Sequence, residues 1–421
     1  MNHRFSRRSF LQLTGTAGAL AALSPVTRAF GVPALLQSGR TITIGMNSWV
    51  TSLDAQSQNG PSNIGYRFYG MMHDSLTQVG RDGQPQPLLA TEWANDGDRW
   101  RFTLRDGVVF HDGTPLTADD VVFSFNRMMS EEYPQNFGNA LLRPFIANVE
   151  ATGDLEVTFT SVQPDPLLPL RLAYHWANIM PRAATEATDF DTLQIAPVGA
   201  GPYKVVEFTT DHLVLEAHSE YWGRPAADRI IVRFIPENAI RVGALQSGEV
   251  DMIANLPIDQ IATINGSSGL KVVTGPLFNH MNVLFNTKTG PTADVNIRRA
   301  LALAIDRQTI VDELFGGFVR PMTDYLQPGT LGFDESLPVI EYNPDAARAA
   351  LEAANYDGTP ISSRLRRATS IPELLTPVID AMWQAVGVTT EFEQMEIGAY
   401  GQKYLLRRGV TATIQSLGLV R

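Results

Sequence analysis

The stretch DRWRFTLRDGVVFHDGTPLTADDVVFSF constrains the fold more than any other part of the sequence. Apolar side chains alternate with polar ones at Trp100, Phe102 and Leu104, which predicts a strand with one buried face. The pair Asp106–Gly107 is typical of a hairpin turn. We therefore expect a return strand at 108–110.

The second half of this stretch predicts a capped helix. Thr117 stands where a helix N-cap belongs, and Asp120 follows three residues later, as in a capping box. Val121 and Phe125 then continue at helical spacing on one apolar face. The acids therefore have structural roles, and His111 has no second histidine at metal-ligand spacing. We interpret the segment as scaffold rather than as a catalytic or metal site.

Composition excludes several classes of function. The chain has 421 residues, enough for two or three domains with a large buried core. Its formal net charge of −11 argues against a nucleic-acid binder, which would need a basic surface. The chain has no cysteine, so disulfides, thiolate nucleophiles and Cys-ligated metal sites are excluded.

The N-terminus predicts export. Arg7 and Arg8 precede an apolar run from Leu11 to Leu23, which is too short to span a bilayer. We interpret residues 1–34 as a twin-arginine signal peptide, which gives a periplasmic protein. The alternative is a short basic amphipathic helix.

Strands and helices alternate along the rest of the chain, which is typical of α/β layering. Gly199 and Gly201 are expected to adopt unusual backbone angles before a strand, and Asp306 is expected to cap a helix. The expected strands are 40–47, 203–208 and TATIQSL near the C-terminus, and the expected helices are 67–76, 238–248 and 346–356, with another ending at Gly387.

Five ordered blocks carry a family resemblance. The block LATEWANDGDRWRFTLRDGVVFHDGTPLTADDVVFSF closely resembles the signature region of the peptide/nickel-type extracellular solute-binding proteins of ABC importers, family 5. The blocks GAGPYKVVEF, YWGRPAADRIIVRFIP, ALQSGEVDMI and VLFNTKTGPTADVNIRRALALAIDRQTIV follow in the expected order. The resemblance covers nearly all of the chain after the signal.

The resemblance implies an α/β fold with two lobes, the type II periplasmic binding protein, and an extra subdomain in the first lobe. We place the first lobe at 35–265, its inserted subdomain at about 75–185 and the second lobe at 266–421. Family sequences continue beyond TATIQSLG with an aromatic and acidic segment that returns to the first lobe. We therefore expect the C-terminal part to be missing and the TATIQSL strand to border an open sheet edge.

A binding protein of this type holds its ligand between the lobes, where pockets are common. Open α/β sheets bind ligands at the carboxyl ends of their strands, and Asn offers a donor and an acceptor to a peptide backbone. The expected ligand-binding residues are Trp49, Ser52 and Leu53 in the first lobe and Asn279, His280, Asn282 and Asn286 in the second. The alternative is that they only cap turns and strand ends.

The resemblance implies a periplasmic component that captures di- or oligopeptides and delivers them to an ABC permease complex. We expect a monomer without metal, cofactor, nucleic-acid partner or enzymatic activity. The alternatives are a nickel chelate or another non-peptide solute as ligand, or a ligand sensor without transport. A secreted hydrolase would need motifs such as G-x-S-x-G or H-E-x-x-H, which are absent, although paired carboxylates distant in sequence stay open.

Overall fold

The structure of the protein is a computed structural model. The described residues are 39–56, 65–130, 142–273, 279–322, 326, 332–367, 370–396 and 412–418. The signal peptide expected at 1–34 lies outside them. In the described ranges, every helix is too short or too polar to cross a membrane.

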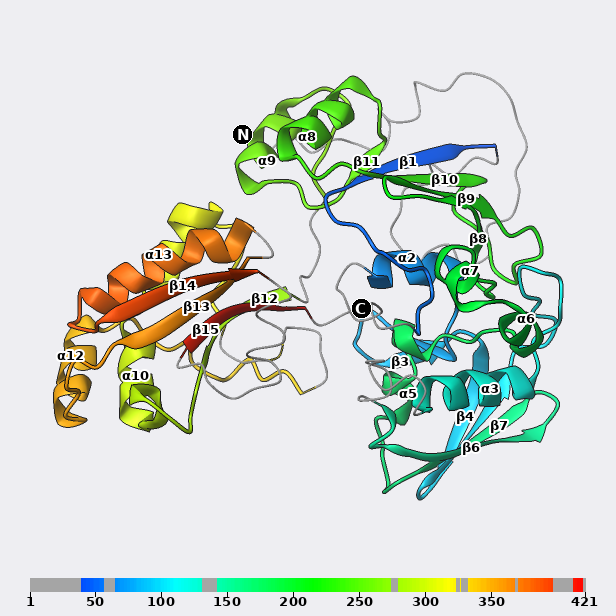
Figure 1. Cartoon of the computed structure of the whole chain (residues 1–421), viewed down its shortest axis with the longest axis horizontal. Helices are drawn as coiled ribbons and strands as arrows, with labels where there is room; N and C mark the ends of the chain where they lie inside the picture. The colour runs from blue at the N-terminus through cyan, green and yellow to red at the C-terminus, as the bar shows by residue number, and fades with distance from the viewer. Residues whose placement is uncertain are drawn as a thin grey trace.

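A five-stranded sheet in the order β11-β1-β10-β9-β8 forms one layer of the first lobe (Figure 1). β1 runs parallel to both β10 and β11, whereas β9 is antiparallel to β8 and β10. The carboxyl ends of β11, β1 and β10 therefore meet at one edge. The strands are β1 (Thr41–Met46), β8 (Tyr203–Phe208), β9 (His212–Ala217), β10 (Arg229–Phe234) and β11 (Met252–Ile253), which confirms those predicted at 40–47 and 203–208.

A second sheet, β4-β5-β7-β6, is antiparallel throughout and packs against helix α3 (Ala118–Met129). Its strands are β4 (Ala90–Asp96), β5 (Arg99–Leu104), β6 (Ile146–Gly153) and β7 (Glu156–Ser161). Trp100, Phe102 and Leu104 are buried on one face of β5, as their alternation predicts. Phe125 and Phe159 pack edge to face across the helix–sheet boundary, with ring centroids 4.8 Å apart.

The prediction of a return strand at 108–110 was wrong. β5 pairs with β4 on one side and with β7 on the other, so neither of its edges is free. The tight connection is the one before β5, where Gly97 has a φ of 70° between β4 and β5. Residues after Asp106–Gly107 instead form a small loop closed by a bridge between Val109 and Pro115.

The capped helix was predicted correctly. Helix α3 (Ala118–Met129) begins after Thr117, which has extended backbone angles. The Asp120 Oδ2 accepts hydrogen bonds from the Thr117 backbone nitrogen, at 2.9 Å, and from its hydroxyl, at 2.7 Å. The other carboxylate oxygen accepts from the backbone nitrogen of Arg182, at 2.8 Å. Asp120 therefore ties the start of α3 to a later segment.

The remaining elements of the first lobe are short and connect the two sheets. β2 and β3 form a two-stranded sheet of their own. Helix α2 ends four residues before the expected position of 76. The elements are α2 (Gly65–Met72), β2 (Thr77–Val79), β3 (Pro85–Pro87), α5 (Leu168–Arg171), η3 (His175–Ala177), α6 (Arg182–Ala187) and α7 (Phe190–Ile195).

Gly199 and Gly201 are required by close packing and not by unusual backbone angles, which corrects the prediction. Neither is among the glycines with positive φ. A methyl group on Gly199 would overlap the Met72 carbonyl oxygen and lie 2.5 Å from the Nδ1 of His73. A methyl group on Gly201 would lie 2.6 Å from the His73 backbone nitrogen. The bond from the Gly201 nitrogen to the Met72 oxygen, at 2.9 Å, needs this approach.

The second lobe contains a four-stranded sheet in the order β12-β15-β13-β14 (Figure 1, yellow-green to red). The strands are β12 (Asn279–Phe285), β13 (Ile361–Arg367), β14 (Thr390–Glu396) and β15 (Ala412–Gly418). β15 is the expected TATIQSL strand. It pairs antiparallel with β12 and parallel with β13. The open edge expected beside it is therefore wrong, because neighbouring strands occupy both of its sides.

Helices cover one face of this sheet around the buried Trp383, whose indole nitrogen donates to the Leu301 oxygen at 3.0 Å. The N-cap at Asp306 is confirmed, because its side chain accepts from the Thr309 nitrogen at 3.0 Å. The elements are η5 (Pro291–Ala293), α10 (Val295–Leu303), α11 (Arg307–Thr309), η6 (Ile310–Leu314), α12 (Pro344–Ala353) and α13 (Ser370–Gln384).

Three further elements follow β10: α8 (Asn238–Ser247), which precedes β11, and η4 (Ile258–Gln260) and α9 (Ile261–Gly266), which come after it. Helix α8 ends at Gly248, with a φ of 77°, as its glycine predicts. β11 follows and extends the first-lobe sheet. Ile258 then packs against the core cluster of the second lobe. The sheet of the second lobe begins at β12, after η4 and α9.

Candidate functional site

Trp49 lies in the loop that follows β1, at the edge where the parallel strands end. Its indole nitrogen donates to the Thr209 oxygen at 3.1 Å. Its ring lies 5.5 Å from that of Phe68 and 5.9 Å from those of Phe208 and Phe234. Trp49 is half-buried, so part of its surface is accessible to a ligand.

Ser52 and Leu53 lie deeper in the first lobe than Trp49. Both side chains are buried, and Leu53 belongs to the core beside α2. The Ser52 hydroxyl accepts from the Asp54 nitrogen at 3.1 Å, and its carbonyl accepts from the Tyr69 hydroxyl at 3.1 Å. Their hydrogen bonds and packing shape the loop that carries Trp49.

The other four expected residues belong to β12 and the turn after it, in the second lobe. The side chains of Asn279 and His280 lie outside the described part of the structure, although their backbone pairs with β15. Asn286 closes the turn, because its Oδ1 accepts from the Lys288 nitrogen at 2.9 Å and its Nδ2 donates to Thr289 at 2.8 Å.

Asn282 differs from these residues in having unused hydrogen-bonding capacity. Its Nδ2 is buried and has no hydrogen-bond partner among the described residues. Met281 and Val283 on either side pack against the helical core of the second lobe. Because successive side chains of a strand point to opposite faces, Asn282 faces away from that core. A buried amide of this kind favours an additional acceptor.

A buried ion pair, not expected from the sequence, fixes the loop that carries Trp49. The Arg127 Nη2 lies 2.7 Å from the Asp54 Oδ2, and both side chains are almost fully buried. Arg127 also donates to the Gln56 Oε1 at 2.8 Å, and Gln56 in turn donates to the carbonyls of Ser124 and Asn178. The sequence signal for this pair was Arg127 itself, a charged residue at a position on the buried face of α3.

His111 is a neutral structural residue in the folded state. Its Nε2 lies 3.0 Å from the Gly201 oxygen, while its Nδ1 accepts from the Gly199 nitrogen at 3.2 Å. One nitrogen donates and the other accepts, which requires the uncharged ring. Burial lowers the pKa of His111 to about 3. These contacts agree with the scaffold interpretation of its segment.

A second buried titratable group, Asp74, lies two residues after the end of α2. Its Oδ2 accepts from the Tyr221 hydroxyl and from the Trp222 indole nitrogen, each at 3.0 Å. Burial raises the pKa of Asp74 to about 7, although these two hydrogen bonds act in the opposite direction. No group of three or more His, Asp or Glu in the described ranges is arranged to bind a metal ion.

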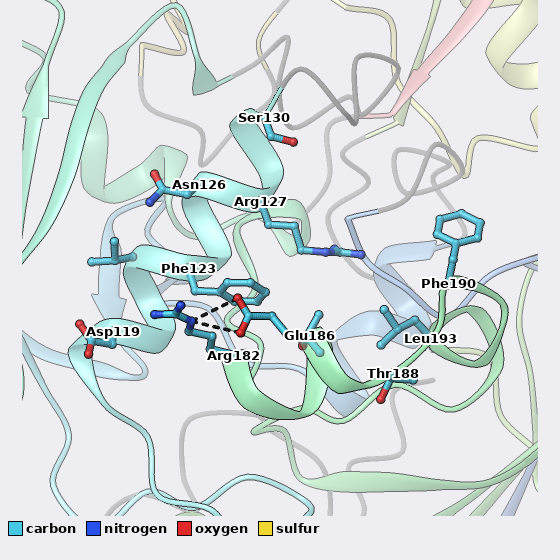
Figure 2. A pocket seen from close by; sticks show the side chains of 12 residues that line it. Asp119, Phe123, Asn126, Arg127, Ser130, Arg182, Glu186, Thr188, Phe190 and Leu193 are labelled. Carbon is cyan, nitrogen blue, oxygen red and sulfur yellow. Dashed lines mark hydrogen bonds and ion pairs between the residues drawn. The ribbon is translucent and has the colours of Figure 1, made fainter.

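A pocket of about 480 Å³ opens on the first lobe, between α3, α6 and α7 (Figure 2). All of its lining residues lie between Asp119 and Leu193, so the second lobe contributes nothing to it. Figure 2 shows Phe123 close to the ion pair of Arg182 and Glu186, whose atoms lie 3.2 Å apart. This pocket is separate from the residues expected to bind ligand.

A family of known proteins matches most of the chain. The family described as bacterial extracellular solute-binding proteins, family 5 Middle, matches residues 84–417. The chain belongs to this family. Members of family 5 are solute-binding proteins and are extracellular by description.

Two curated relatives support the assignment to family 5. Heme-binding protein A of Haemophilus influenzae is 27% identical over 333 residues, covering 72% of this chain and 61% of that protein. Probable di/tripeptide-binding protein 5 of Pseudomonas aeruginosa is 32% identical over 293 residues, covering 64% and 56%. The chain spans about three fifths of the length of these relatives.

Solved structures support the two-lobed fold of family 5. The ABC transporter-associated periplasmic binding protein DppA of Helicobacter pylori, in complex with the peptide STSA, aligns with a TM-score of 0.78. It is 21% identical, and the alignment covers 91% of this chain and 79% of that one. At this identity the likeness shows the fold alone, and that fold is the predicted two-lobed α/β architecture.

Proposed function

We propose that this protein is the substrate-binding component of an ABC importer and that it captures di- or oligopeptides between its two lobes. The family match over residues 84–417 carries this proposal. A relative named as a di/tripeptide-binding protein favours a peptide over other solutes. The protein would deliver its ligand to a membrane permease as a monomer, without nucleic acid and without catalysis.

Native mass spectrometry of freshly purified protein tests the ligand class. We expect the protein to retain a ligand whose mass and fragmentation match a peptide. A bound haem or nickel chelate would contradict the peptide assignment and leave the solute-binding function in place. Protein that binds no member of a mixed panel of peptides, haem and nickel–histidine would contradict solute binding itself.

The proposed ligand contacts combine the half-buried ring of Trp49 with the unused donor of Asn282. Asn279, His280 and Asn286 border them on the second lobe, while Ser52 and Leu53 support the loop of Trp49. The proposed boundaries are 35–265 and 266–421 for the lobes and 75–185 for the inserted subdomain. Trp49 follows the carboxyl end of β1, where α/β proteins bind ligands, whereas Asn282 lies in the middle of β12.

Asn282→Ala should weaken binding of the peptide recovered from the native protein by about 1 kcal/mol, because one hydrogen bond is lost. Titration calorimetry measures this change. Asn343→Ala is the matched control, since this amide on the same lobe caps α12 by accepting from the Ala346 nitrogen at 2.9 Å. Its melting temperature should fall while its affinity stays the same. Equal affinity losses in both variants would refute the specific role of Asn282.

We further propose that the protein reaches the periplasm by the twin-arginine route, from the Arg7–Arg8 pair. Changing both residues to Lys should leave the precursor in the cytoplasm, because the charge is kept but the recognised pair is lost. Cell fractionation measures the distribution. Normal export of the double-Lys protein would instead indicate the general secretory route.

A further inference from the structure

The pocket between α3, α6 and α7 is lined by apolar side chains, although it opens on the surface of the first lobe (Figure 2). Val122 and Phe123 of α3 are half-buried and line one wall, and Phe190 and Leu193 of α7 line another. The Phe190 ring is 55% exposed, so it is accessible to an occupant. The volume of about 480 Å³ suits a small molecule.

Thr185 of α6 offers this pocket a hydrogen-bonding group that the rest of the described chain does not use. The residue lines the pocket and is only 7% exposed. Its hydroxyl forms no hydrogen bond with any other described residue. Because a buried hydroxyl normally has a partner, this one favours an occupant that carries a donor or an acceptor.

The charged side chains that line the pocket need no charge from an occupant. Arg127 pairs with Asp54 at 2.7 Å, and Arg182 pairs with Glu186 at 3.2 Å. Asp119 lies in the first turn of α3, where the helix dipole stabilises a carboxylate. The chemistry therefore fits an uncharged molecule that combines an apolar ring with a hydroxyl or a similar polar group.

Two walls of the pocket also hold the loop that carries Trp49. Arg127 of α3 forms the buried ion pair with Asp54. The Leu53 backbone nitrogen donates to the carbonyl oxygen of Gln194, in α7, at 2.7 Å. Two successive residues of the loop are thus held by two helices that line the pocket. An occupant that holds α7 against α3 restrains this loop as well.

We propose that the pocket is a second ligand site, which takes a small uncharged molecule with an apolar ring and a hydroxyl group and which restrains the loop of Trp49 when it is filled. The site is separate from the proposed peptide site and goes beyond peptide capture. Its tests use no peptide, so their outcome is independent of the proposed function.

Two probes, p-cresol and toluene, test the site because they share a methylated ring and differ by one hydroxyl. Affinities are measured by NMR titration. Thr185→Val removes the hydroxyl and should weaken p-cresol binding about fivefold, with no effect on toluene. Thr152→Val on β6 is the matched control, since that hydroxyl bonds to Glu156 at 2.9 Å, and it should change neither affinity. Equal p-cresol affinities in all three proteins would overturn the assignment.

Val122→Trp provides a second variant, because the larger side chain fills the pocket. It should abolish binding of both probes, and binding that persists would place them elsewhere and overturn the proposal. Should the variants not fold, the unsubstituted protein decides the question. Nuclear Overhauser effects should connect the p-cresol ring with the Leu193 methyl groups, and effects to other parts of the protein alone would contradict the site.

Hydrogen exchange tests the link between the pocket and the loop. Saturating p-cresol should slow exchange of the Leu53 amide, because its acceptor lies in a helix that the probe restrains. The Ile235 amide, which bonds to the Met46 oxygen at 2.7 Å, is the control and should not change. Bound p-cresol with unchanged exchange at Leu53 would refute the restraint of the loop.

Discussion

At the scale of single residues, glycines show how one residue type serves different purposes. Gly201 carries no side chain because the backbone of Met72 and His73 occupies that space. Gly243, in the middle of α8, has open space where a side chain would lie. The sequence indicated that Gly201 was special, but close approach of segments distant in sequence was the reason.

Gly201→Ala should destabilise the protein by about 1–3 kcal/mol, because the added methyl group forces apart a packed backbone contact. Gly243→Ala is the control and should stabilise it by about 0.5–1 kcal/mol, because glycine is a poor helix former. Urea denaturation measures both. A Gly201→Ala protein as stable as the original would show that the contact with Met72 relaxes without cost.

At the scale of elements, local sequence signals predicted several helix ends correctly, whereas the sequence did not predict which strands pair. The cap of α3 and the end of α8 depend on neighbours in sequence, and both were correct. One partner of β5, the strand β7, and both partners of β15 are distant in sequence. The return strand expected at 108–110 and the open edge expected beside β15 were therefore both wrong. Of the candidate site, the sequence supplied residues after β1 and in β12, but not the contact of Arg127 with Asp54.

The ion pair of Asp54 and Arg127 joins the loop after β1 to α3. Asp54→Asn should cost about 3–5 kcal/mol, because it leaves a buried guanidinium without its counter-charge. Glu150→Gln is the control. It removes the carboxylate of an exposed pair with Arg99 and should cost about 0–1 kcal/mol. Similar melting temperatures for the two variants would contradict the assigned importance of the buried pair.

At the scale of the whole molecule, buried titratable groups make stability depend on pH. Burial lowers the pKa of His73 to about 4 and that of His111 to about 3. Below their ordinary value of 6.5, the unfolded chain therefore binds protons that the folded protein does not. Asp74 acts oppositely, because burial raises its pKa to about 7 and the folded state keeps a proton that the unfolded state loses.

The two histidines together contribute more to this pH dependence than Asp74 does in the opposite direction. The free energy of unfolding should therefore fall as the pH decreases from about 6.5 to 4. Asp74→Asn removes the opposing contribution and should make this fall steeper. Denaturation midpoints measured across this range test both statements. Constant or rising stability toward pH 4 would contradict the neutral state assigned to the two histidines.

The position of β15 has a consequence for how the chain folds during synthesis. Asn279 pairs with Gly418, and β15 separates β12 from β13. β12 therefore emerges from the ribosome long before its partner exists, and the sheet of the second lobe closes only with the last strand described. Pairing across such a distance in sequence is slow and leaves strand edges open to other chains meanwhile. The second lobe should thus be the late-folding half and the part that chaperones recognise on a nascent chain.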